Sequence, residues 1–266
     1  IVLIAPEGAE PQRLTAALDG GDVASLILPA WGMDDDAFQR HAEAIVPAAQ
    51  AQGVAVMIAG DARVAMRSHA DGLHAETSRH ELEDLIAKHQ AKLMIGTGGA
   101  TTRDEALELG EARPDYIFFG RFGYDTKPEP HPRNLKLGGW WAEMVQVPCI
   151  VMAGATVESA AAGAAAGVDF VALSSVVFAS DTDPAAIVAQ VNALLAFLQS
   201  IDPERIYLVG DIVDGWRLKK SWYWPPAGNR VVQHLLEMLR RGARVVYVPG
   251  NHDEFLREFM VLRFGG

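Results

Sequence analysis

The sequence predicts an α/β protein: a (β/α)8 TIM barrel followed by a shorter, partial α/β segment. Short apolar runs alternate with longer amphipathic runs eight times before residue 200. The apolar runs are rich in Val, Ile, Leu and Phe with little polar alternation, which indicates strands that are buried on both faces. The eight units are evenly spaced without a marked break, and this favours a closed barrel over a doubly wound open sheet.

Each unit has its own local signals. We expect strands at residues 1–5, 23–29, 53–59, 71–75, 91–96, 115–120, 148–154 and 168–174. Helices are expected between them, at 34–53, 78–90, 101–112 and 156–167, and the eighth at 183–200. The first of these opens with Asp residues and ends at Gly53, while Ser78 and Glu81 form a predicted capping box at the start of the second.

The chain changes character after Ser200. We expect strands at 205–211 and 243–251, a helix at 229–242 between them, and another helix at 253–264. Two parallel strands cannot bury both faces alone. The sequence therefore predicts a barrel over residues 1–198 and an incomplete domain over 199–266, which must dock on something or belong to a larger domain.

Composition excludes several classes of function. The formal net charge is −11 and the pI is about 5.1, so no nucleic-acid or anionic-membrane partner is expected. No apolar run approaches the ~18 residues of a membrane span, and no signal peptide precedes the fold. Cys149 is the single cysteine, which precludes an internal disulfide and favours a reducing, cytoplasmic compartment.

The ends of the last barrel strands predict a phosphate site. In TIM barrels such sites lie in the loops after strands seven and eight, where this chain has Gly154, Ser174 and Ser175. Glycine lets a backbone N–H approach an anion, and serines add donors. Thr126 and Lys127, in the long polar loop after strand six, could contact a second phosphate or a leaving group. Short turns and a solvated loop are the alternative readings.

Several segments of the barrel resemble the thiamine phosphate synthase family: 70–74 ("ADGLH"), 115–128 ("DYIFFGRFGYDTKP") and 150–179. The resemblance implies transfer of a pyrimidine diphosphate to a thiazole phosphate, with release of diphosphate and the use of Mg²⁺. By this resemblance Thr126 and Lys127 match the end of the family's T-x-T-K motif. Gly154 matches its glycine-rich turn, and Ser174 and Ser175 match its terminal serine motif.

Other family motifs are missing. The diphosphate-binding "QLREK" is replaced by "LILPAW" at 26–31, and the "ND" motif falls on Ala59 and Gly60. Asp61, one position further, is the substitute metal ligand, and Glu76 is the carboxylate nearest to the family's Mg²⁺-binding Asp. We therefore expect a retained monophosphate pocket with weak or no synthase activity. His69, His74 and His80 fit ordinary surface or strand-end histidines better than a metal site, because their spacing is irregular.

The final segment resembles the calcineurin-like metallophosphoesterases, in the branch of UDP-2,3-diacylglucosamine pyrophosphatase. The motifs are "GDIVDGW" at 210–216 and "GNHDE" at 250–254. The resemblance implies that Asp211 bridges two metals, that Asn251 binds one and that catalytic His252 acts on the phosphate. Earlier and later ligand motifs are missing, so divalent ions such as Mn²⁺ are expected only if absent sequence completes the site. Alone, this segment is not expected to hydrolyse phosphate esters.

The functional alternatives are thus a synthase-like barrel that binds a small phosphorylated molecule, a metal-dependent phosphoesterase, and a non-catalytic phosphate-binding module. The Trp-rich stretch at 216–224 could serve self-association or face a partner. The arrangement is compatible with a natural fusion, a gene remnant or an assembly artefact. The absent initiator Met and the abrupt end favour a fragment or a join.

Overall fold

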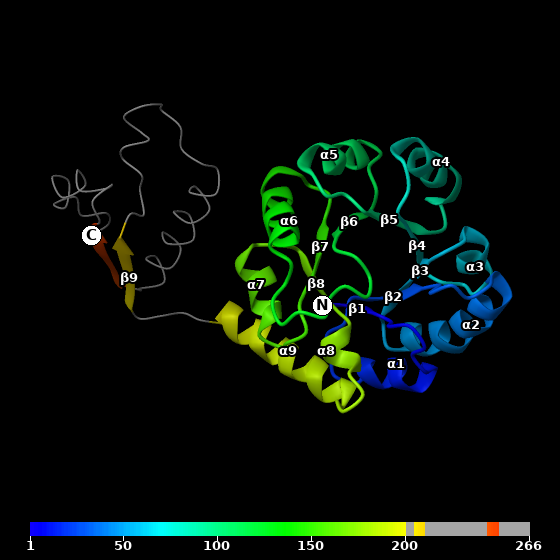
Figure 1. Cartoon of the computed structure of the whole chain (residues 1–266), viewed down its shortest axis with the longest axis horizontal. Coiled ribbons are helices and arrows are strands. Elements are labelled where there is room, and N and C mark those ends of the chain that lie inside the picture. Colours follow the sequence, from blue (N-terminus) through cyan, green and yellow to red (C-terminus); the bar gives the residue numbers. More distant parts are fainter. Residues whose placement is uncertain (201–204, 211–243, 250–266) are drawn as a thin grey trace. The chain divides into compact units, whose positions relative to one another are not determined.

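The computed structural model describes residues 1–200, 205–210 and 244–249 (Figure 1). The chain divides into two compact units, Ile1–Gln199 and Ser200–Gly266. The helices expected at 229–242 and 253–264 and the Trp-rich stretch lie outside the described residues.

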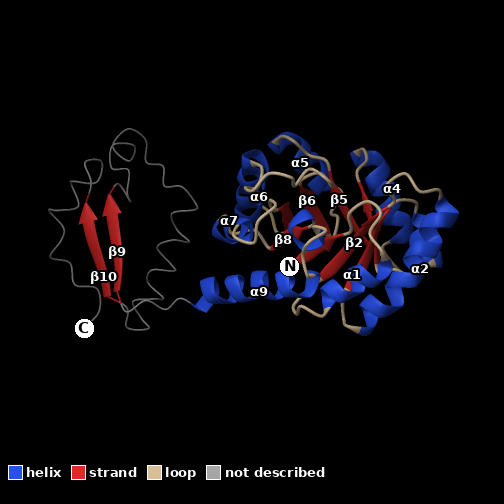
Figure 2. Ribbon diagram, turned by 60° about the horizontal axis from the view of Figure 1, so that its bottom comes forward, coloured by secondary structure: helices blue, strands red, loops and turns tan. Residues whose placement is uncertain are grey.

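The first unit is a closed barrel of eight parallel strands in sequential order, with β1 paired to both β2 and β8. This confirms the predicted TIM barrel. Helices surround the ring of strands (Figure 1), and the side view shows the strands inside that layer (Figure 2). The strands are β1 (Val2–Ile4), β2 (Ser25–Pro29), β3 (Ala55–Ala59), β4 (Gly72–Ala75), β5 (Met94–Gly98), β6 (Tyr116–Phe119), β7 (Cys149–Met152) and β8 (Phe170–Leu173).

The sequence predicts five of the helices, at 34–53, 78–90, 101–112, 156–167 and 183–200, and gives no bounds for the other four. Nine helices are present in the described residues. They are α1 (Pro11–Leu18), α2 (Asp35–Ala51), α3 (Ala62–Arg67), α4 (Arg79–His89), α5 (Arg103–Glu111), α6 (Pro132–Met144), α7 (Ser159–Ala165), α8 (Ser175–Phe178) and α9 (Pro184–Ser200). The capping box of Ser78 and Glu81 is present at the start of α4. The one-turn helix α8, between β8 and the expected eighth helix, was not predicted, because four residues are too few to show a helical period.

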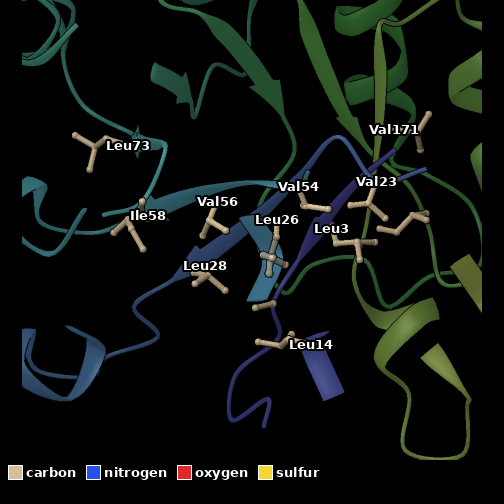
Figure 3. Close-up of a cluster of buried hydrophobic side chains, with 14 of the residues drawn as sticks. Leu3, Leu14, Val23, Leu26, Leu28, Val54, Val56, Ile58, Leu73 and Val171 are labelled. Carbon is tan, nitrogen blue, oxygen red and sulfur yellow. The ribbon is translucent and has the colours of Figure 1, made fainter. Parts of the chain in front are cut away.

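Each strand buries both of its faces. Leu3, Leu26 and Val56 belong to the cluster between the strands and the surrounding helices (Figure 3), whereas Ile4 and Ile27 belong to a second cluster inside the barrel. Neighbouring residues point to opposite faces of a strand. Two apolar environments therefore demand continuous apolar runs, which explains the missing polar alternation in the sequence.

The second unit contains two described strands, β9 (Arg205–Gly210) and β10 (Arg244–Pro249). They pair in parallel, from Arg205 with Arg244 to Gly210 with Pro249. This confirms the two strands that the sequence predicts there. Among the described residues, no helix is long and apolar enough to cross a membrane.

Three aspartates each lie one position before an even-numbered strand of the barrel. Each accepts a hydrogen bond from a backbone N–H at the start of the preceding strand. Asp71 accepts a hydrogen bond from the Val56 N–H at 2.7 Å, Asp115 from Ile95 at 2.6 Å and Asp169 from Cys149 at 2.9 Å. The bond fixes the height of one strand against the next at the amino-terminal rim. Repetition of the same bond three times pins the register of six of the eight strands.

The single cysteine is part of the core. Cys149 is fully buried, and burial raises the pKa of its thiol to about 12. Since the thiolate is the reactive form, this thiol is inert in the folded barrel.

We expect Asp71→Ala to lower the free energy of unfolding by about 1–3 kcal/mol, because the Val56 N–H loses its acceptor. Asp71→Asn keeps an acceptor oxygen and should cost less. Urea denaturation followed by circular dichroism measures both. Asp84→Ala, at an exposed position on α4, is the control and should stay within about 0.5 kcal/mol of the parent. An equal loss in the two alanine variants would disprove the role of the rim bond.

Alkylation of Cys149 measures whether the barrel closes around it. Iodoacetamide at pH 8 should leave the folded chain unmodified and label it fully in denaturant, as read by mass spectrometry. Stoichiometric labelling of the folded chain would show that the packing of β7 against α6 is wrong.

Candidate functional site

The loops after β6, β7 and β8 meet on one side of the barrel mouth, where the carboxyl ends of the strands lie. The residues that the sequence proposes for phosphate binding come from these three loops. Thr126 and Lys127 are exposed in the loop after β6, while Gly154 and Ser174 are buried at the ends of β7 and β8. The five proposed residues thus come directly from the segments that follow three neighbouring strands.

The amide of Ser175 already holds an oxyanion from the chain itself. The carboxylate of Asp125 accepts a hydrogen bond from the Ser175 N–H at 2.6 Å, and the Ser175 hydroxyl donates to the Asp125 carbonyl at 2.7 Å. Asp125 is only 5% exposed. These two bonds tie the loop after β6 to the start of α8, where the sequence places a phosphate.

The amides after β7 are also occupied. The Gly154 N–H donates to the Ser159 hydroxyl at 3.0 Å, and the Ala155 N–H donates to the Lys127 carbonyl at 2.8 Å. A Cβ on residue 154 would lie 2.2 Å from the Pro128 carbonyl oxygen. Glycine at 154 is therefore required for close approach of the loop after β6, rather than for an open anion site in this state.

Between this loop and the first turn of α6 lies a pocket of about 650 Å³. Its floor is formed by Gly120, Met152 and Ala153 at the ends of β6 and β7. Thr126 and Lys127 line it, and so do other polar residues of the loop and helix, among them Arg121, Asp125, Glu129, His131, Arg133 and Asn134. The pocket, rather than the loops after β7 and β8, is the open space next to the predicted residues.

Inside the barrel, His74 from β4 lies among aromatic side chains. Its Nδ1 is 3.0 Å from the Tyr116 hydroxyl, and its ring lies 5.9 Å from that of Phe118 and 5.2 Å from that of Phe122. Burial raises the pKa of Tyr116, so its hydroxyl keeps the proton and can donate to Nδ1. Among the described residues, the buried Nε2 of His74 has no hydrogen-bond partner, and a carboxylate oxygen of Glu76 is 3.9 Å away.

The loop after β2 brings an indole to the mouth in place of the basic residues that the family resemblance implies. The Trp31 Nε1–H donates to the Ala5 carbonyl at 2.8 Å. Its ring reaches Gly123, where a Cβ would lie 3.2 Å from the indole. Trp31 adopts a φ of 48°, which is uncommon for a bulky residue. The loops after β1, β2 and β6 are therefore joined across the mouth.

The carboxylates near the mouth do not form a metal cage. Asp61 caps α3 through the Arg63 N–H at 2.7 Å and pairs with the Arg63 guanidinium at 3.0 Å, which lowers the pKa of the carboxyl. A metal at Asp61 would have to replace Arg63. Among the described residues, no group of three His, Cys, Asp or Glu side chains could hold an ion by itself, so an Mg²⁺ ion here would need phosphate oxygens of a substrate as further ligands.

The other polar residues that the sequence analysis considered lie in other elements or outside the described residues. Arg79 pairs with Glu83 and Glu111 on the outer helices. His69 follows α3, His74 lies in β4 and His80 lies in α4, so the three histidines come from separate elements. Asp211, Asn251 and His252 lie outside the described residues, although in the sequence they come just after β9 and β10.

Sequence reasoning missed Asp125, Trp31 and Asn134. In the sequence, Asp125 stands at the variable position of the T-x-T-K motif. Trp31 stands in the loop where the family resemblance implies basic residues. Nothing in the pattern indicates that Asn134 is buried, with 8% of its surface exposed, at the start of α6. The burial of one polar residue among the polar side chains at the start of a helix cannot be predicted from the sequence pattern. It depends on the loop that folds against the helix.

Comparisons with known proteins agree with this description. Residues 1–177 match the family model of thiamine monophosphate synthase, and residues 174–264 match that of calcineurin-like phosphoesterases. The second match begins inside the barrel unit, at the end of β8.

Similar proteins cover the barrel. The thiamine-phosphate synthase of Rhodospirillum centenum is 34% identical over 203 residues, which are 73% of this chain and 97% of that protein. That of Hyphomonas neptunium is 35% identical and covers 70% and 87% of the two chains. The solved thiamine phosphate pyrophosphorylase of Pyrococcus furiosus has the same fold, with a TM-score of 0.64 at 17% identity, over 74% of this chain and 96% of that one. The chain therefore belongs to the thiamine monophosphate synthase family.

Proposed function

We propose that the barrel binds a small phosphorylated molecule at the β6–β8 side of its mouth, as the thiazole-phosphate end of a thiamine phosphate synthase-like site. The observation that carries the proposal is the pair of bonds between Asp125 and Ser175. The Ser175 amide donates to a carboxylate oxygen and the Ser175 hydroxyl donates to a carbonyl oxygen, and a phosphate oxygen can accept from donors of both kinds.

Access for a phosphate requires movement of the loop after β6. The Asp125 carboxylate and a phosphate cannot share the Ser175 amide, because two negative charges in contact repel each other. When Asp125 leaves, the Lys127 carbonyl that holds the Ala155 amide is only two residues away and can move with it. Ser174, Ser175 and the Ala155 amide would then present donors to one ligand, with the Lys127 ammonium beside them, while the Gly154 N–H stays bonded to the Ser159 hydroxyl.

The transfer reaction itself needs more than this end of the site. Joining a pyrimidine diphosphate to the thiazole ring requires that the negative charge of the departing diphosphate be met by cations. Here Trp31 lies in the loop after β2 where the family resemblance implies basic residues, and the Asp61 carboxylate is paired with Arg63. We therefore propose binding with weak synthase turnover.

Removal of the Asp125 charge should strengthen ligand binding. In calorimetry with thiazole phosphate, Asp125→Asn is expected to bind about tenfold more tightly than the parent, or ~1.4 kcal/mol, because the phosphate no longer displaces a carboxylate. Glu158→Gln is the control: it removes the same charge from an exposed position after β7. Equal gains in both variants would mean a general charge effect. Equal affinity for the unphosphorylated thiazole alcohol would contradict phosphate recognition.

A synthase assay with both substrates and Mg²⁺ tests the second half of the proposal. We expect turnover far below the ~10 s⁻¹ that is typical of enzymes. Turnover of ordinary size would show that cations outside the described contacts complete the site.

One observation favours a second candidate, a metal-dependent phosphoesterase. β9 and β10 pair in parallel and end in register at Gly210 and Pro249, and Asp211 and Asn251 follow these ends in the sequence. Ligands at adjacent strand ends suit a two-metal site of the kind that calcineurin-like phosphoesterases use. Further sequence would have to supply the remaining ligands. Metal analysis of the purified chain decides: two ions per chain would favour this candidate.

A further inference from the structure

The guanidinium of Arg13, in helix α1, is bonded to the segment that follows α8. Its Nη2 donates to the carbonyl oxygen of Ala179 and to two oxygens of Thr182, the carbonyl at 3.1 Å and the hydroxyl at 3.3 Å. α1 and α8 lie side by side where the first and last units of the barrel meet (Figure 1). These bonds therefore join the two ends of the barrel sequence, across 166 and 169 positions.

Thr182 connects Arg13 to α8 itself. Its hydroxyl lies 2.9 Å from the Val177 carbonyl oxygen and 2.8 Å from that of Ala179, and it can donate to either. Carbonyl groups at the end of a helix have no partner within the helix, so they need donors from elsewhere. Arg13 and Thr182 together supply those donors at the carboxyl end of α8.

The charge of Arg13 suits this position. Among the described residues, no carboxylate lies within ion-pair distance of Arg13. The cation instead faces carbonyl oxygens at the end of a helix, where the partial charge is negative. α8 has only four residues and no side-chain cap at its start, and so short a helix is not stable by itself. Val176 and Val177 anchor it in the core, while its ends are held by polar bonds.

The opposite end of α8 carries donors of the proposed phosphate site. The Ser175 N–H donates to the Asp125 carboxylate at 2.6 Å, and the Ser175 hydroxyl donates to the Asp125 carbonyl at 2.7 Å. Hydrogen bonds weaken steeply when the donor turns away from its acceptor. Because α8 is a single turn, a change of tilt at its carboxyl end also turns the donors of Ser175.

We propose that Arg13 is a positioning residue for the barrel mouth: it holds the carboxyl end of α8 and thereby sets the direction in which Ser175 donates. In the ligand-free chain the acceptor is Asp125. With a phosphate bound, the same orientation serves the ligand, and this part of the inference rests on the proposed function. Arg13 acts through α8 and is not a ligand-binding residue in this scheme.

Hydrogen exchange of the Ser175 amide in the full chain, measured by NMR, tests the inference without a ligand. Arg13→Gln should speed exchange at Ser175 about tenfold, the effect expected of one lost charge-assisted bond. The Leu82 amide, bonded to Ser78 within α4, should be unchanged. Arg40→Gln is the matched control: it removes the same charge from an exposed position on α2 and should alter exchange at Ser175 by less than roughly twofold.

Two further variants separate positioning from folding. Arg13→Lys keeps one nitrogen with three N–H donors and should recover most of the protection, because only Nη2 makes the bonds. Thr182→Val keeps the shape without the hydroxyl, so exchange at Ser175 should rise. Faster exchange at Ser175 and Leu82 alike, no change at Ser175 in Arg13→Gln, or equally fast exchange in the Lys and Gln variants would overturn the inference.

Calorimetry with thiazole phosphate tests the ligand-dependent part. It is done in an Asp125→Asn background, where no carboxylate competes for the Ser175 amide, and adding Arg13→Gln should weaken binding about tenfold. Unchanged affinity would refute the positioning role alone. No binding in either background, together with the expected exchange pattern, would refute the proposed function and still support the role of Arg13.

Discussion

Burial of the eight barrel strands on both faces is the constraint on which the barrel depends. The interior cluster around Ile4, Ile27 and Phe118 and the outer cluster around Leu3, Leu26 and Val56 can both form only if the sheet closes on itself. Closure brings the carboxyl ends of all eight strands to one rim. Residues that are fifty positions apart, such as Asp125 and Ser175, thereby become hydrogen-bond partners.

The electrostatics of the mouth follow from that rim. Amides after β7 and β8 that would suit a phosphate are bonded to Ser159, Lys127 and Asp125, so the ligand-free site is closed by the chain itself. Arg121, Lys127 and Arg133 line the pocket between the loop after β6 and α6. Donors that are satisfied within the chain become available to an anion only after a loop movement, and this distinguishes the mouth from a preformed cage.

The family relationship and the site chemistry are separate matters. Similarity to thiamine-phosphate synthases covers the barrel nearly from end to end. Yet Trp31 lies where basic residues are implied, and Asp61 is held by Arg63. A fold is maintained by many apolar contacts, whereas catalysis depends on a few charged groups. The fold is therefore retained although those groups differ.

The sequence by itself determined the barrel, its eight strands and the capping box at Ser78, because these depend on local apolar periods and on short-range hydrogen bonds. It also identified the loops of the mouth through Gly154, Ser174 and Lys127. Only the tertiary structure decided which donors those loops leave free. That Asp125 reaches Ser175, that Trp31 crosses to Gly123 and that Asn134 is buried depend on contacts between distant segments, which no local pattern encodes.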